Sequence, residues 1–122
     1  MTTQTALRGI HGEDIVAHHL EKQGFTIVER NYRQRYGEID IIAQKTDLIV
    51  FVEVKARAYN RHFDHTQSIT SSKQRKIALV AQRYLAQYHH DDKTCRFDVA
   101  IVEYKDTTPT IVYLDNAFQW EG

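Results

Sequence analysis

Charged side chains interrupt two short segments of this 122-residue sequence that are otherwise rich in isoleucine and valine. Asp40 lies within residues 38–44, and Glu53 and Lys55 lie within residues 49–55. Both segments have the composition of β-strands, in which successive side chains point to opposite faces. Each strand is therefore expected to carry one apolar face and one charged face. The charged faces hold the residues whose types and spacing could do chemistry.

A turn of only three polar residues, 45–47, joins the two segments and predicts a β-hairpin. If Lys45 pairs with Leu48, the same register places Asp40 directly across from Glu53. Opposed side chains on one face have Cβ atoms roughly 4.5–5.5 Å apart, so two carboxylates there repel each other unless a cation or a proton lies between them. Mg²⁺ prefers oxygen ligands and commonly binds one or two carboxylates. The pattern therefore predicts a site for Mg²⁺, or for Mn²⁺, at Asp40 and Glu53.

The lysine of the second segment adds a positive charge to this predicted site. Lys55 follows Glu53 by two residues and is expected on the same face, about 6.6 Å further along the strand. From there its ammonium group can reach a phosphate oxygen or a metal-bound water. Two carboxylates and a lysine supply metal binding, activation of water and charge stabilisation, which together suit phosphodiester hydrolysis. The alternative is an exposed hairpin face with an ordinary Glu53–Lys55 charge pair.

The segment before these strands contributes a further candidate acid. Apolar residues at helical spacing predict a helix over residues 6–23, which ends at Gly24. Glu13 lies on the same stripe as Ala17 and Leu20, which directs its side chain toward the sheet. A buried acid needs a partner, so Glu13 is a candidate for the same site. The alternative is an acid at the edge of the apolar stripe.

Positive charge is concentrated in one part of a sequence that is neutral overall. Residues 54–90 contain seven basic residues and one acid, whereas the rest contains nine basic residues and fifteen acids. This region holds an aperiodic loop, residues 56–70, and a helix predicted to begin with a capping box from Ser71 to Gln74. The first turn of a helix offers free amides to phosphate. We predict a nucleic-acid-binding surface, with a solvated helix face as the alternative, formed by Arg33, Arg35, Arg57, Arg61, Lys73, Gln74, Arg75 and Lys76.

The remaining periodicities complete an α/β fold. Strands are predicted over residues 25–32, 96–104 and 110–114, and the apolar stripe of the helix that begins at Ser71 reaches Tyr88. The order αβββαββ, with a crossover helix, implies a mixed β-sheet flanked by helices in a single domain over residues 1–122. Asp98, in the fourth strand, is expected to make structural hydrogen bonds, with a carboxylate that supports the metal site as the alternative.

Composition excludes several classes of protein. Hydrophobic residues make up 42% and charged residues 26% of the sequence, which is typical of a globular protein rather than of a disordered chain. No apolar run exceeds five residues, so no membrane span is expected, and the N-terminus lacks the features of a signal peptide, which favours the cytoplasm. The single cysteine, Cys95, excludes an intramolecular disulfide and a thiolate zinc cage, and it is expected to be a small core residue.

Five segments of the sequence resemble, in order and spacing, the uncharacterised bacterial YraN-like family. They are residues 12–13, 24–25 and 30–33, the segment GEIDIIA at 37–43 and the segment FVEVKAR at 51–57. The resemblance implies a restriction-endonuclease-like fold of the PD-(D/E)xK nuclease superfamily, related to archaeal Holliday-junction resolvases. It also implies that Asp40 and Glu53 are the metal carboxylates, that Lys55 is the lysine of the motif, and that Glu13 assists the metal site.

Residues and resemblance together lead to one functional hypothesis and two alternatives. The leading hypothesis is a Mg²⁺- or Mn²⁺-dependent nuclease that hydrolyses DNA phosphodiester bonds, including those of branched or recombination intermediates. A homodimer would supply the two sites that a symmetric double cut needs, and RNA remains an alternative substrate. The first alternative is a nucleic-acid-binding or assembly module that keeps the fold without cleavage. The second is a structural interaction protein with a paired-charge hairpin.

Overall fold

The computed structural model describes residues 4–65, 68–88 and 92–119 and has the predicted element order αβββαββ. The last strand is longer than predicted, because its pairing with the preceding strand continues through a register shift to Phe118. The elements are α1 (Gln4–Lys22), β1 (Thr26–Gln34), β2 (Gly37–Lys45), β3 (Leu48–Ala58), α2 (Ser71–Gln87), β4 (Thr94–Lys105) and β5 (Thr108–Phe118).

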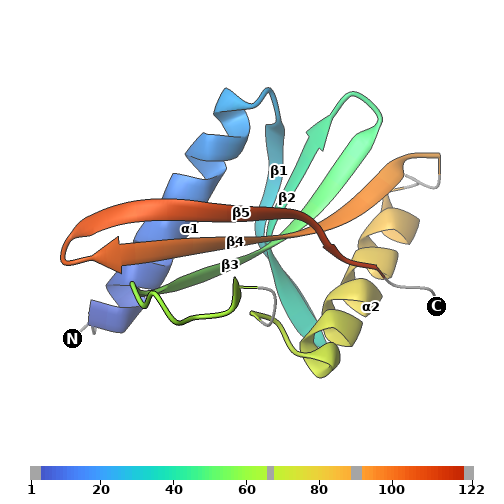
Figure 1. Ribbon diagram of the computed structural model, residues 1–122. Coiled ribbons are helices and arrows are strands. Elements are labelled where there is room, and N and C mark those ends of the chain that lie inside the picture. The colour runs from blue at the N-terminus through green and yellow to red at the C-terminus, as the bar shows by residue number, and fades with distance from the viewer. Residues whose placement is uncertain (1–3, 66–67, 89–91, 120–122) are drawn as a thin grey trace.

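The strands form one sheet in the order β1-β2-β3-β4-β5 (Figure 1). Strands β1, β2 and β3 are antiparallel neighbours, as are β4 and β5, whereas β3 and β4 are parallel. Parallel neighbours need a crossover connection, and α2 lies in that connection. The mixed sheet flanked by helices that the sequence predicts is therefore confirmed.

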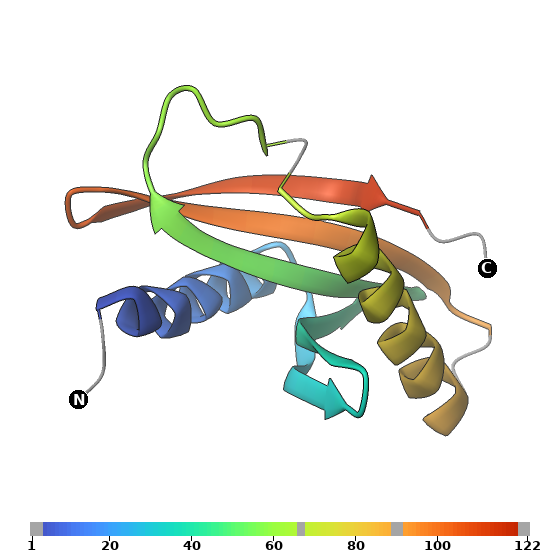
Figure 2. The same cartoon turned by 90° about the horizontal axis from the view of Figure 1, so that it is seen from below.

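Alternation along β3 divides its side chains between two buried clusters, one for each helix. Val52 packs in the first cluster with Leu20 of α1. Phe51 packs in the second with Tyr84 of α2, and the two rings meet edge-on with their centroids 6.0 Å apart. Odd-numbered residues of β3, Glu53 among them, therefore face the α2 side. Figure 1 and Figure 2 both show the β1–β2 hairpin between the two helices.

The N-terminal cap of α2 lies one residue before the predicted one. Thr70, not Ser71, is the N-cap: its backbone is extended (φ −75°, ψ 159°), and its side-chain oxygen accepts a hydrogen bond from the Lys73 N–H at 3.2 Å. Gln74 does not complete a capping box, because its side-chain amide donates to the Ile69 carbonyl at 3.3 Å. Ser71 already belongs to the helix, so its hydroxyl is not in the cap position.

Cys95 is exposed, and the expectation that it is a core residue is wrong. It is the second residue of β4, in the part of the strand that pairs with β3 alone, because pairing with β5 begins only at Phe97. Burial in β4 starts at Asp98, once a neighbouring strand lies on each side. Within the described part of the chain, neither helix is long and apolar enough to cross a bilayer.

Candidate functional site

The two predicted acids lie where β2 and β3 separate. The hairpin register is confirmed from the turn up to the pair Ile41↔Val52, but Asp40 and Glu53 do not form the next ladder pair. Instead, the Asp40 carboxylate accepts a hydrogen bond from the Val54 N–H at 2.8 Å. A side chain thus takes the place of a backbone acceptor, and β2 is free to turn away from β3.

Asp40 and Glu53 are almost fully buried and interact directly. Their exposed fractions are 8% and 7%. Burial, and next the charge of Glu53, raise the pKa of Asp40 to about 7, although the hydrogen bond from Val54 opposes this shift. Burial also raises the pKa of Glu53, against the opposing effects of two lysines and of a side-chain hydrogen bond with Asp40. The carboxyl pair therefore holds a proton up to near-neutral pH.

The two lysines beside Glu53 come from different elements. Lys73, in the first turn of α2, places its Nζ 3.6 Å from Glu53 Oε1. Lys55 lies two residues along β3 on the same face as Glu53, as predicted, and is half-buried. Both ammonium groups lower the pKa of Glu53, Lys73 more than Lys55. The sequence predicts Lys73 as a phosphate ligand, and no local pattern indicates its contact with a strand residue twenty positions earlier.

Helix α1 brings a third acid to the same region. Burial and the nearby charge of Asp40 raise the pKa of Glu13, whereas a hydrogen bond with Asn31 and the charge of Arg30 lower it. The guanidinium of Arg30 lies 3.7 Å from Glu13 Oε1. Asn31, in the middle of β1, has a left-handed backbone with φ 53°. Neither Arg30 nor Asn31 is among the predicted site residues, although the family-like segment 30–33 contains both and an asparagine inside a predicted strand is a further signal.

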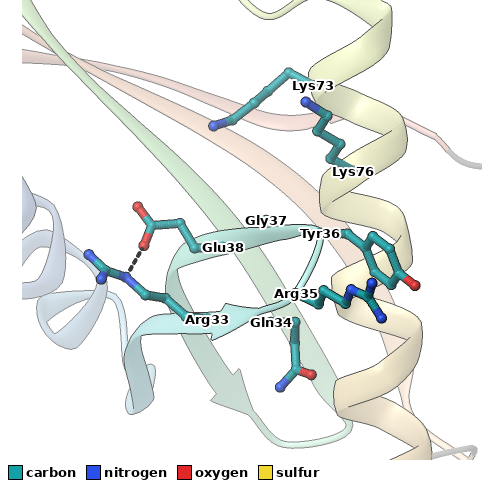
Figure 3. A pocket seen from close by; sticks show the side chains of 8 residues that line it. All are labelled: Arg33, Gln34, Arg35, Tyr36, Gly37, Glu38, Lys73 and Lys76. Carbon is teal, nitrogen blue, oxygen red and sulfur yellow. Dashed lines mark hydrogen bonds and ion pairs between the residues drawn. The ribbon is translucent and has the colours of Figure 1, made fainter.

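A basic cleft lies next to the carboxyl pair, between α2 and the turn of the β1–β2 hairpin (Figure 3). Its volume is 510 Å³. Arg33 pairs with Glu38 across the hairpin at 2.8 Å, which leaves the cleft with a clear excess of positive charge. Lys73 both lines the cleft and contacts Glu53, so the two features are continuous. The lining residues are Arg33, Gln34, Arg35, Tyr36, Gly37, Glu38, Lys73 and Lys76.

The other predicted nucleic-acid-binding residues do not line this cleft. Arg57 packs over the ring of Phe63, with its guanidinium carbon 3.4 Å from the ring centroid. Arg61 is exposed and donates a hydrogen bond to His62 in the loop that follows β3. Arg75 is exposed on α2, about 200° around the helix axis from Lys73 at 100° per residue. Gln74 is committed to the Ile69 carbonyl, as described above.

Asp98 has the structural role that the sequence predicts. It is fully buried and accepts hydrogen bonds from the guanidinium of Arg96 through both carboxylate oxygens at 2.9 Å. The Tyr113 hydroxyl and the Asn116 N–H donate two more. These four hydrogen bonds use both oxygens of the carboxylate and connect β4 to β5. Asp98 is therefore not available to the site.

Comparison with solved structures gives a weak likeness. SfsA of Pyrococcus furiosus, in a structure with Ca²⁺, has 15% sequence identity and a TM-score of 0.39, covering 91% of this chain and 63% of that one. These values are too low to bear on the function of this chain.

Comparison with sequences gives a clear result. A UPF0102 protein of Rhodococcus opacus is 41% identical over 111 residues, covering 90% of this chain and 94% of the relative. A UPF0102 protein of Desulforapulum autotrophicum is 42% identical over 119 residues, covering 98% of each. The model of the uncharacterised protein family UPF0102 matches residues 12–102. The resemblance stated from the sequence motifs is therefore confirmed, and the chain belongs to the uncharacterised protein family UPF0102.

Proposed function

We propose that this protein is a metal-dependent nuclease that hydrolyses phosphodiester bonds of DNA, branched or recombination intermediates included. One observation carries the proposal: a buried carboxyl pair, Asp40 and Glu53, lies beside Lys55 and continues through Lys73 into a basic cleft. We place this activity in a single domain spanning residues 1–122, acting in the cytoplasm as a homodimer.

The donor chemistry of the carboxyl pair fits Mg²⁺ or Mn²⁺. Asp40 and Glu53 would be the protein's ligands, and within residues 4–65, 68–88 and 92–119 no group of three or more His, Cys, Asp or Glu side chains is arranged to hold a metal ion. Mg²⁺ commonly binds through one or two carboxylates and fills its other positions with water and phosphate oxygens. Binding would also relieve the repulsion from Glu53, which adds to the effect of burial in raising the pKa of Asp40. When bound, the ion would polarise a phosphate oxygen and lower the pKa of its water.

The side chains around the pair have separate tasks in this proposal. Burial raises the pKa of Glu53, and Lys73 opposes this shift, which favours the ionised form that binds a cation. Lys55 donates hydrogen bonds to the phosphate oxygens on which negative charge grows as the new P–O bond forms. Glu13, whose pKa is raised by burial and by Asp40, can hold a proton close to the reacting group. The basic cleft binds the phosphates that flank the scissile bond.

A second candidate function is a nucleic-acid-binding module without cleavage, and one observation favours it. The negative charge of the carboxyl pair is already reduced without a metal ion. The raised pKa of Asp40 favours its protonated form, and Lys73 lies beside Glu53. In that case the basic cleft would bind nucleic acid, and Asp40 would serve only to close the gap between β2 and β3.

Cleavage assays separate the two functions. We expect the wild-type protein to cut members of a panel of branched and linear DNA and RNA in Mg²⁺ or Mn²⁺. Asp40→Asn should abolish cutting, because a neutral amide is a poor ligand for a hard cation, and should retain binding. Asp47→Asn, which alters an acid 88% exposed at the turn of the same hairpin, is the matched control and should cut normally. A wild-type protein that binds DNA and cuts nothing in either metal would contradict the nuclease proposal and favour the binding module.

A further inference from the structure

An aromatic ring stands at the tip of the β1–β2 hairpin, in the lining of the basic cleft. Tyr36 is 60% exposed, more than any other large apolar side chain in the described part of the chain. The Arg35 guanidinium lies 5.8 Å from the centre of its ring. Figure 3 shows this pair at the turn, with Lys73 and Lys76 extending from α2. The cleft thus combines phosphate-binding cations with an accessible aromatic face.

Packing against α2 fixes the position of this ring-bearing turn. The ladder between β1 and β2 closes with Gln34 opposite Gly37, so Tyr36 sits in a two-residue turn. The backbone at Gly37 lies directly against the helix: a Cβ atom there would be 3.6 Å from Lys76 Cβ and 3.8 Å from Val80 Cγ2. The turn therefore holds Tyr36 at a set place relative to the lysines, as a binding platform requires.

The form of nucleic acid follows from what an exposed ring can contact. In a paired duplex the bases are stacked on one another and their faces are covered, so a duplex presents phosphates to the cleft but no base face to Tyr36. Unpaired bases present free faces, and sites for single strands combine a cationic path for the backbone with aromatic stacking partners. Such stacking tolerates any sequence, since every base has a π face.

We propose that Tyr36 is a stacking platform for an unpaired base and that the basic cleft binds a single-stranded stretch of nucleic acid. The inference deepens the proposed function and rests on it for the cleavage step, because Lys73 connects the cleft to Glu53 at 3.6 Å. The substrate class it specifies is DNA with unpaired nucleotides beside the scissile bond, such as a flap, a gap or a splayed arm, rather than continuous duplex.

Binding measurements without metal test this proposal independently of cleavage. The full chain is titrated in EDTA with single-stranded DNA, single-stranded RNA and blunt duplex DNA, and a 2-aminopurine base in the single strands reports stacking through loss of fluorescence. Tyr36→Ala should weaken single-strand binding roughly 5- to 150-fold and abolish the fluorescence loss. Duplex binding should change less than twofold. Tyr36→Phe should behave as wild type, because it keeps the ring.

Tyr59→Ala is the matched control. Tyr59 is 50% exposed and also lies near a cation, with Lys105 Nζ 5.9 Å from its ring centroid, but it does not line the basic cleft. The proposal is overturned if Tyr36→Ala leaves single-strand affinity unchanged, weakens duplex binding equally, or has no more effect than Tyr59→Ala. We expect the single-stranded DNA to bind at least as tightly as the single-stranded RNA, and tighter binding of the RNA would overturn the assignment of DNA as the substrate. If single-strand binding depends on Tyr36 as expected but no nucleic acid is cleaved, the result would contradict the proposed nuclease activity and still support the stacking role of Tyr36.

Discussion

Asp40 lies where the strand ladders on both sides of β2 are interrupted. On the β1 side its cross-strand neighbour is Asn31, whose left-handed backbone takes that residue out of the ladder. On the β3 side its carboxylate accepts the Val54 N–H. Asparagine adopts the left-handed conformation more readily than most residues, because its short amide side chain can bond locally. Asp40 therefore lies at a break in the regular ladder on each side of β2, although its side chain stays almost fully buried.

Metal-free stability should fall with rising pH because of this residue. The pKa of Asp40 is raised in the folded protein from 3.8 to about 7, so the folded state binds its proton more tightly than the unfolded state. The stabilising contribution is fully present below about pH 4 and is lost as the pH rises through 7. In EDTA, we expect the free energy of unfolding in urea to drop by on the order of 2 kcal/mol between pH 5 and pH 8.

Asp40→Asn should remove most of this decrease, because the amide does not titrate. Asp47→Asn should retain the wild-type decrease, since its carboxylate is exposed. An equal decrease in the wild type and in Asp40→Asn would show that other groups cause the pH dependence.

Helix α2 connects the packing of the sheet to the chemistry of the site. Its inner face places Tyr84 against Phe51, while its first turn places Lys73 beside Glu53 and its second turn places Lys76 in the lining of the basic cleft. The residue at which the helix begins decides the direction of each lysine, since a shift of one residue rotates a side chain by about 100°. The cap is therefore part of what positions the site.

Substitutions at the start of α2 distinguish the observed cap from the predicted one. Thr70→Ala removes the acceptor for the Lys73 N–H and should lower the free energy of unfolding by about 1 kcal/mol. Ser71→Ala should change it by less than about 0.5 kcal/mol, because Ser71 is an exposed helical residue. Urea denaturation of both variants is the measurement. A larger loss for Ser71→Ala than for Thr70→Ala would place the cap where the sequence alone suggests.

At the scale of the whole molecule, binding to a polyanion must depend on where the cations lie, because the net charge is zero. Four predicted cations meet in the basic cleft, and Arg57, Arg61 and Arg75 lie elsewhere. A neutral protein can still attract phosphate locally when one face gathers positive charge.

Salt dependence measures how many cations contact phosphate. Replacing Arg35 and Lys76 together with alanine should reduce the slope of log K against log salt for single-stranded DNA by roughly 1.4, at about 0.7 per phosphate contact. The matched double variant removes the same charge outside the cleft, at Arg61 and Arg75, and should leave the slope nearly unchanged. Equal effects from the two double variants would mean that net charge, rather than the cleft, governs binding.

Local chemistry in the sequence determined the element order, the hairpin register and the closeness of Asp40 to Glu53. Strand alternation has a period of two residues, and a short turn fixes which residues face each other, so both can be read within a few positions. The shared face of Glu53 and Lys55 follows from the same rule. These features need no knowledge of how distant segments pack.

Only the tertiary structure decided which side chains complete the site. The contact of Lys73 with Glu53 depends on the rotation of α2 and on its docking against β2, and the two residues are twenty positions apart. The partners of Glu13 depend likewise on how α1 crosses β1. The exposure of Cys95 depends on where β5 begins to cover β4. Helix docking and strand coverage are sums of many weak contacts between remote segments, and no short pattern of residues encodes them.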